Sequence, residues 1–249
     1  SVQPEPPKEE IVLEKPTETT QQPEKPSEET PVVAPGEEEK GEAKEEESPP
    51  VAETDEVEGE QRGSVFIYKD MALPMFGGNK YACDRYAAAL AKYQDALGDS
   101  VQIYNLVIPS SIEFYLPKKY KDKGITADEK ENIDYIYAQM NPGIKTVDAY
   151  SSMMEAKENG EYIYFRTDHH WTHLGAYYAY TALCKTLGYT PASLDKFQTG
   201  QWDNFVGSMY TYIANYPQSA VLKNNPDTVH YWKPYANCET YYYSDTTLS

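Results

Sequence analysis

A break in composition near residue 63 divides the chain into a segment that cannot build a core and one that can. Residues 1–63 hold 20 of the 40 acidic residues, 6 of the 22 basic residues and 10 of the 18 prolines, but no Tyr, Phe or Trp. Such a segment buries too little apolar surface to offset the entropy lost on folding. We therefore expect residues 1–63 to form a disordered, Pro- and Glu-rich linker, and residues 64–249 to form one domain. A spacer is the simpler role for the linker, and a partner-binding tail is the alternative.

Charge and hydropathy exclude several classes of protein. The net charge is −18, and the folded region lacks a cluster of basic residues, so neither nucleic acid nor an anionic membrane is an expected partner. No run approaches the roughly 18 apolar residues that span a bilayer. The chain begins with Ser1 instead of Met, and we expect that an N-terminal signal or anchor has been removed. Cys83, Cys184 and Cys238 are widely spaced and odd in number, which argues against a disulfide framework or a zinc knuckle.

Strand-like and helix-like patterns alternate along the folded region. Strands are predicted at 65–68, 101–108, 144–147 and 161–165, and helices at 80–97, 128–140, 153–156 and 172–187. Alternation of this kind is typical of an α/β fold with a mainly parallel sheet. From Gln198 onward no clear period remains.

Three of the four histidines fall in the segment 166–173, RTDHHWTH, between a predicted strand and a predicted helix. Ligands and catalytic groups gather at the carboxyl ends of parallel strands. A carboxylate two residues from a histidine can fix the ring tautomer, so that the other ring nitrogen can accept a proton from a hydroxyl nucleophile. A helix N-terminus beside the ring also disfavours the imidazolium form. We therefore predict Asp168 and His170 as a catalytic pair.

Two other interpretations of this segment remain open. The histidines can simply cap and pack a tight turn, with Asp168 as a residue at the start of the helix. Alternatively, Asp168, His169 and His173 offer ligand types that zinc accepts. A helix that begins near Thr172 would break the i, i+4 geometry of the two histidines, and no second ligand cluster is evident. We expect no metal and no cofactor.

The segment 164–172, YFRTDHHWT, followed by Gly175-Ala176-Tyr177, resembles the signature of the DHHW family of exported bacterial proteins. These proteins are similar to the SGNH-hydrolase-like domains of the alginate O-acetyltransferase group. The resemblance implies a three-layer α/β/α sandwich and a Ser-His-Asp triad that acts on acyl esters of surface polysaccharides. The Asp-x-His pair of the alginate group falls on Asp168 and His170, whereas the Asp-x-x-His spacing of classical SGNH hydrolases would place Trp171 at the histidine position.

The resemblance also places the nucleophilic serine after the Asp-x-His pair, on a later strand that turns into a helix. No serine after His170 has that context; Ser208 lacks a clear strand before it, so we expect it to line the site. Arg166, Trp171 and Tyr210 complete the expected substrate-binding set. The domain is accordingly expected to be C-terminally incomplete.

These observations predict an exported carbohydrate O-acetyltransferase or acetylesterase-like domain at the cell surface, with a polysaccharide substrate. The resemblance alone implies a membrane-bound O-acyltransferase as partner. The alternative is a non-catalytic polysaccharide-binding or scaffold protein of the same surface system.

Overall fold

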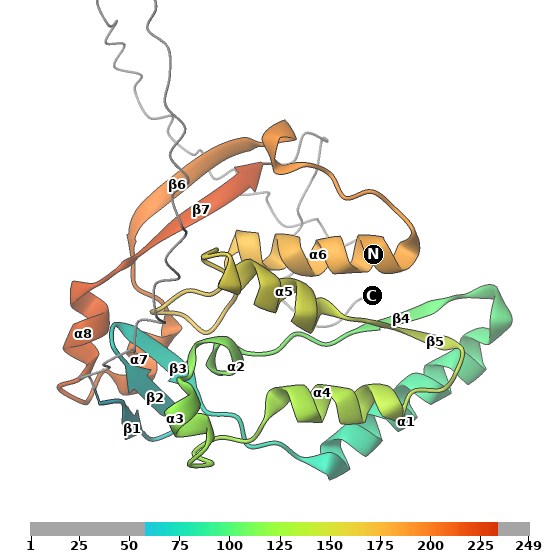
Figure 1. Ribbon diagram of the computed structural model, residues 1–249, viewed down its shortest axis with the longest axis horizontal. Coiled ribbons are helices and arrows are strands. Elements are labelled where there is room, and N and C mark those ends of the chain that lie inside the picture. The colour runs from blue at the N-terminus through green and yellow to red at the C-terminus, as the bar shows by residue number, and fades with distance from the viewer. Residues whose placement is uncertain (1–57, 234–249) are drawn as a thin grey trace, which may run out of the picture. The chain divides into compact units, whose positions relative to one another are not determined.

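The computed structural model describes residues 58–233, shown in colour in Figure 1. Most of the predicted linker and Cys238 therefore lie outside the described residues. The helices are α1 (Lys80–Leu97), α2 (Ser111–Tyr115), α3 (Lys118–Lys121), α4 (Glu129–Ala138), α5 (Ala149–Glu158), α6 (His173–Leu187), α7 (Ser208–Ile213) and α8 (Ser219–Asn224), with 3-10 turns at Gly98–Ser100 and Leu194–Lys196. The strands are β1 (Glu60–Arg62), β2 (Val65–Tyr68), β3 (Met71–Pro74), β4 (Ile103–Leu106), β5 (Ile144–Val147), β6 (Gln198–Phe205) and β7 (Asp227–Lys233).

The described region opens with an antiparallel three-stranded sheet in the order β1-β2-β3. Gly63 turns the chain between β1 and β2 at a φ of 58°, and Lys69 turns it between β2 and β3 at a φ of 54°. Turns this short can join only antiparallel neighbours. Because β1 begins at Glu60, the folded region starts a few residues before the boundary at Ser64 that composition suggests.

Local capping chemistry sets the helix ends at the predicted places. The side chain of Asn79 accepts from the amide of Ala82 at the start of α1, and Thr172 does the same for Gly175 at the start of α6. Gly188 ends α6 in the left-handed conformation, at a φ of 75°. These features are the ones that Asn, Thr and Gly favour at helix termini. As a result, α6 begins directly after the histidine-rich segment.

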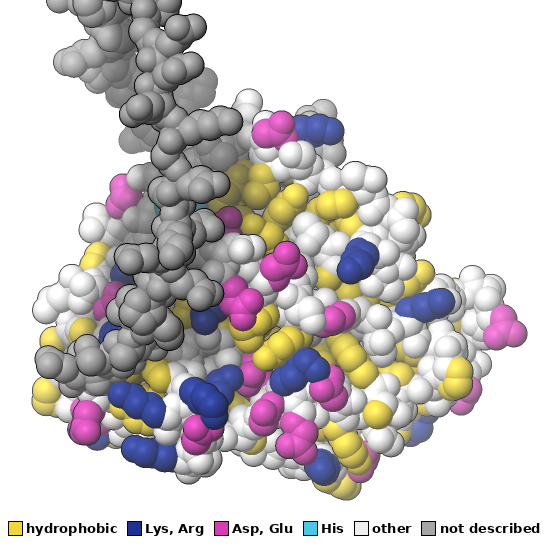
Figure 2. Space-filling model, in the orientation of Figure 1, with side chains coloured by type: hydrophobic (Ala, Val, Ile, Leu, Met, Phe, Trp, Pro, Cys, Tyr) yellow, Lys and Arg dark blue, Asp and Glu magenta, His cyan; other side chains and the backbone are white. Residues whose placement is uncertain are grey.

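The strands β4 and β5 form a parallel pair in which Ile103 lies opposite Ile144. In Figure 1, α5 and α6 lie side by side, and α1 runs beside α4. The main hydrophobic core joins residues of β2, β3, α2, α5 and α6. Its most deeply buried side chains include Leu73, Ile112, Met153 and Ile163. On the face shown in Figure 2, acidic and basic side chains are interspersed.

Two predictions about strands need correction. A mainly parallel sheet was predicted, but among residues 58–233 only β4 and β5 pair in parallel, while the other two sheets are antiparallel. Residues 161–165 form no strand: Tyr164 makes a single bridge to Trp171. The backbone of this segment closes on its own loop instead, since the amide of Phe165 donates to the carbonyl of His170. Among the described helices, none combines the length and hydrophobicity needed to cross a bilayer.

Candidate active site

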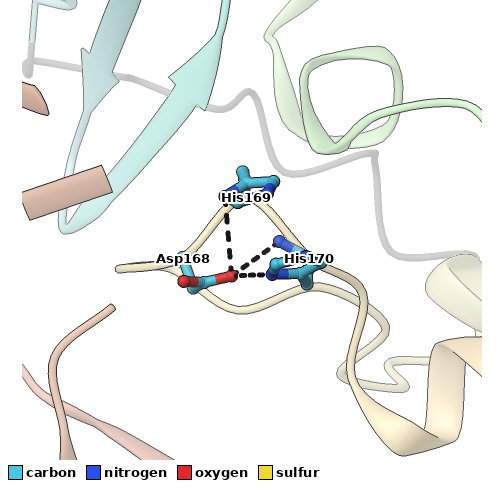
Figure 3. Close-up of side chains that lie close together, drawn as sticks. All are labelled: Asp168, His169 and His170. Carbon is cyan, nitrogen blue, oxygen red and sulfur yellow. Dashed lines mark hydrogen bonds and ion pairs between the residues drawn. The ribbon is translucent and has the colours of Figure 1, made fainter. Parts of the chain in front are cut away.

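The histidine-rich segment forms a tight loop that is closed at its base by two backbone hydrogen bonds. The amide of Phe165 donates to the carbonyl of His170 at 3.3 Å, and the amide of Thr172 donates to the carbonyl of Ile163 at 2.9 Å. Between these contacts the chain places Asp168, His169 and His170 at the tip of the loop, as Figure 3 shows.

Asp168 and His170 form the predicted pair. Oδ1 of Asp168 lies 2.6 Å from Nδ1 of His170, and it also accepts from the backbone amide of His170 at 2.8 Å. The Asp168 side chain is 9% exposed, whereas the His170 side chain is 66% exposed. An ionised carboxylate only accepts hydrogen bonds, so the proton lies on Nδ1. Nε2 of His170 is then a proton acceptor, and within residues 58–233 no side chain hydrogen-bonds to it.

The second oxygen of Asp168 is held by the start of α7. Oδ2 accepts from the backbone amide of Ser208 at 2.8 Å and from its hydroxyl at 3.0 Å. Burial alone would raise the pKa of Asp168, but the hydrogen bonds from Ser208 and His170 outweigh it and lower the pKa to about 2. Asp168 is therefore ionised at any physiological pH.

His169 contacts both Ser208 and Asp168. Its Nδ1 lies 2.6 Å from the hydroxyl oxygen of Ser208 and 3.8 Å from Oδ1 of Asp168. Its ring centroid lies 3.8 Å from that of His170, with an interplanar angle of 37°. Both imidazoles are thus packed together over one carboxylate.

The buried carboxylate of Asp227, at the start of β7, holds the segment that leads into Asp168. Oδ2 of Asp227 accepts from the amide of Thr167 at 2.9 Å and from its hydroxyl at 2.6 Å. Oδ1 accepts from the amide and Nε of Arg166, at 3.2 and 3.1 Å, and from the hydroxyl of Tyr162. Asp227 and Thr167 are fully buried. The backbone beside Asp168 is therefore fixed from a strand about 60 residues away in sequence.

Space for the Asp168 carboxylate depends on Gly207. A Cβ at this position would lie 2.3 Å from Cβ of Asp168 and 2.5 Å from its Oδ2. The amide of Gly207 also donates to the hydroxyl of Thr167 at 3.0 Å. A side chain at residue 207 would push Asp168 out of its position.

The context of Ser208 differs from the one that the sequence suggested. β6 ends at Phe205 and α7 begins at Ser208, so this serine does lie on a strand-to-helix junction. Its hydroxyl contacts Asp168 and His169, however, and not the free Nε2 of His170. Among the described residues, Ser208 is the serine whose hydroxyl contacts Asp168 and His169.

The other predicted site residues lie in different surroundings. The Arg166 guanidinium is engaged by Asp227, by Oδ2 of Asp70 at 2.7 Å and by the carbonyl of Pro226 at 3.0 Å. Half-buried Trp171 packs against the main core, and half-buried Tyr210 packs against the smaller hydrophobic cluster. Whether these three contact a substrate stays a prediction.

Sequence reasoning missed Asp227 and assigned no role to Thr167, although both shape the site. Asp227 belongs to no motif, whereas Thr167 lies in the segment that carries the DHHW signature, and only the fold brings the two together. Tyr212 lies with its ring centroid 6.5 Å from that of His169, and it is 61% exposed. The sequence predicts that Tyr212, like the other tyrosine-rich stretches, either stacks on a sugar or packs against the domain, and contact with a sugar stays a prediction.

Within residues 58–233, the side chains grouped closely enough to hold a metal are Asp168, His169 and His170, which include the predicted catalytic pair. The candidate ligand atoms of Asp168, His169 and His170 lie within 4.8 Å of one another. His173, which the zinc interpretation required, is the exposed first residue of α6 and lies outside this group. Binding through Nδ1 of His170 would require the loss of its proton and of its hydrogen bond to Asp168. The donor set therefore suits a hydrogen-bonded pair better than a metal.

Comparisons with known proteins identify the family of this chain. A family model described as DHHW protein matches residues 8–243. No curated protein sequence matches this chain. A crystal structure of a DHHW family protein from Eubacterium siraeum is similar, with 31% identity and a TM-score of 0.64 over 72% of this chain. The chain spans 57% of the length of that protein.

Two further structures are more distant. Bacillus cereus PatB1 with a sulfonyl adduct matches with 17% identity and a TM-score of 0.50, over 69% of this chain and 57% of that one. The O-acetyltransferase domain of Pseudomonas putida AlgJ matches with 18% identity and a TM-score of 0.47, over 72% of this chain and 66% of that one. The PatB1 match shows a shared α/β fold. Since the family model covers nearly the whole chain and its Asp-His-His-Trp signature is residues 168–171, the chain belongs to the DHHW family.

Proposed function

We propose that this chain is the O-acetyltransferase or acetylesterase-like domain of an exported protein that acts on cell-surface or extracellular polysaccharide. The observation that carries the proposal is the Asp168–His170 pair: an ionised, buried carboxylate 2.6 Å from Nδ1 of an exposed imidazole. A hydrogen-bonded pair of this kind is how a hydroxyl nucleophile is activated in acyl transfer.

In the proposed mechanism His170 acts as a general base and then as a general acid. Nε2 of His170 takes the proton of a serine hydroxyl while the serine oxygen bonds to the carbonyl carbon of an acyl ester. Asp168 stabilises the resulting imidazolium. The proton then passes from Nε2 to the leaving alcohol, which leaves an acyl-serine. In the second step His170 deprotonates a sugar hydroxyl or water, whose oxygen bonds to the acyl carbon; the bond to the serine oxygen breaks, and His170 returns the proton to that oxygen.

We place the nucleophilic serine outside residues 58–233. Ser208 points at Asp168 and His169, so its proton has no direct path to Nε2 of His170. In the complete domain, β4 and β5 would belong to a three-layer α/β/α sandwich of the SGNH type, and the region from residue 64 would be only part of that domain.

The substrate class and partner rest on the family resemblance and on the exposed position of His170. A polysaccharide that carries O-acetyl groups fits an acyl-transfer site open to solvent, and a membrane-bound O-acyltransferase is the proposed donor. Trp171 and Tyr210 are proposed to contact the sugar at the margin of the site. Arg166 is hydrogen-bonded to Asp227, and Ser208 is hydrogen-bonded to Asp168. These bonds favour a positioning role for Arg166 and Ser208 over direct contact with the substrate.

Turnover of p-nitrophenyl acetate by the intact protein tests the proposal. We expect Asp168→Ala and His170→Ala to abolish turnover, and His173→Ala to retain it, because His173 is exposed and lies outside the cluster. Unchanged turnover in the first two variants would remove both residues from the mechanism. An intact protein that binds polysaccharide but turns over no acyl ester would instead support the alternative, a non-catalytic binding or scaffold protein.

A further inference from the structure

We propose that His169 is a positioning residue for the Asp168–His170 pair and acts through the hydroxyl of Ser208. In this arrangement Nδ1–H of His169 donates to Oγ of Ser208, and the Ser208 hydroxyl donates to Oδ2 of Asp168. The inference rests on the proposed function for its catalytic meaning, but the hydrogen-bond chain itself is independent of it.

The available protons determine which group donates in each hydrogen bond between His169, Ser208 and Asp168. The Ser208 hydroxyl has one proton and two neighbours that might accept it, Oδ2 of Asp168 at 3.0 Å and Nδ1 of His169 at 2.6 Å. Asp168 is a carboxylate, which accepts charge-assisted hydrogen bonds and offers no proton in return. The hydroxyl therefore donates to Asp168, and its short contact with His169 requires a proton on Nδ1 of that ring.

These hydrogen bonds fix the orientation of the Asp168 carboxylate. Its two oxygens are chemically equivalent and can exchange by rotation of the carboxylate. The donors on Oδ1 come from His170, and the donors on Oδ2 come from Ser208, 40 residues away on α7. With both oxygens engaged, Oδ1 stays directed at Nδ1 of His170. His169 completes the restraint, since its Nδ1–H orients the Ser208 hydroxyl.

The packing of the two rings adds a second restraint. The centroids of His169 and His170 lie 3.8 Å apart, so loss of the His169 ring would leave the exposed His170 ring free on that side. Figure 3 shows the two rings on the same loop, with dashed lines from both to one oxygen of Asp168. The hydrogen bonds at Nδ1 of each ring lead us to expect both histidines in the Nδ1–H tautomer, which is the less common form of free neutral histidine.

Long-range ¹H–¹⁵N correlation spectra of the 249-residue chain above pH 8 test the hydrogen-bond chain without any need for activity. We expect His169 and His170 to show the Nδ1–H tautomer, and exposed His173 to show mostly Nε2–H. In Ser208→Ala, His169 should revert to Nε2–H while His170 keeps Nδ1–H. An Nε2–H signal for His169 in the unmodified chain would overturn the proposal.

Rescue by a conservative variant tests the positioning role in the intact, active protein. Asparagine places an N–H donor near the position of Nδ1, whereas leucine does not. We expect His169→Leu to lower kcat for an acetyl ester by roughly tenfold, the effect of one lost hydrogen bond, with little change in KM. His169→Asn should stay within about threefold of the unmodified protein, and Ser208→Ala combined with His169→Leu should add little to the single change.

Equal losses in His169→Asn and His169→Leu, or full activity in His169→Leu, would refute the positioning role. If the tautomers are as predicted but no acyl ester is turned over, the hydrogen-bond chain stands and the proposed function fails.

Discussion

Substitution of Asp227 by alanine should destabilise the fold more than any change at an exposed carboxylate. Asp227 is fully buried, and its two oxygens accept five hydrogen bonds from three residues of the segment before Asp168: Tyr162, Arg166 and Thr167. Removal of the carboxylate leaves the Thr167 amide without an acceptor and the Thr167 hydroxyl with only its 3.4 Å contact to the carbonyl of Phe205.

The expected loss of free energy of unfolding follows from the hydrogen-bond donors that lose their acceptor. The amide of Thr167 and its hydroxyl are buried, and each unsatisfied buried donor costs about 1–3 kcal/mol. Arg166 keeps its contacts with Asp70 and with the carbonyl of Pro226, so its charge is not left isolated. The loss of stability comes instead from the two Thr167 donors and from the Tyr162 hydroxyl, which also loses its acceptor. We therefore expect Asp227→Ala to reduce the free energy of unfolding by about 3–5 kcal/mol.

Urea denaturation followed by tryptophan fluorescence measures this loss, and Asp203→Ala provides a matched control. Asp203 lies on β6, the strand paired with β7, but it is exposed, and its hydrogen bonds within residues 58–233 are to Gln201 and Thr228. Its substitution should change the free energy of unfolding by no more than about 0.5 kcal/mol. The transition midpoint of Asp227→Ala should fall while the slope of the transition stays the same. A loss below about 1 kcal/mol, or a loss equal to that of Asp203→Ala, would refute the reasoning.

Three further predictions concern the site itself. Because the folded state lowers the pKa of Asp168 to about 2, its ionised form stabilises the fold above pH ~4, and up to about 2 kcal/mol should be lost as the pH falls from ~4 to ~2; acid titration of Asp168→Asn should lack this step. Gly207→Ala should cost about 1–3 kcal/mol by overpacking against Asp168, whereas Gly77→Ala, which meets no atom within 4 Å, should be neutral in the same urea assay. Metal analysis of the purified protein should find less than stoichiometric zinc, and one zinc per chain that is lost in His169→Ala would show that the cluster is a metal site.

Features set by neighbouring residues were predictable from the sequence. Gly98 and Gly188 end the helices that their positions indicated, and Thr172 caps α6, because capping depends on residues within one turn. The proximity of Asp168 and His170 was predictable for the same reason, since two residues on one loop can face each other without help from the rest of the fold.

Features set by distant residues were not predictable. The strand β6 is exposed along most of its length, so it lacks the alternation that would reveal it, and only its pairing with β7 defines it. The apolar run at 161–165 resembles a buried strand, yet its hydrogen bonds close the loop that carries Asp168. The contacts of Asp168 with Ser208, and of Thr167 with Asp227, span 40 and 60 residues, and no spacing rule foretells them.

We propose that Asp168 and His170 activate a hydroxyl nucleophile. Mass spectrometry of the intact protein after treatment with a small sulfonyl fluoride tests it directly, because this reagent reacts with activated serine hydroxyls. We expect one adduct, on a single serine, in the unmodified protein and in His173→Ala, and none in Asp168→Ala or His170→Ala. The absence of any adduct in the unmodified protein, or an adduct that persists without His170, would contradict the account.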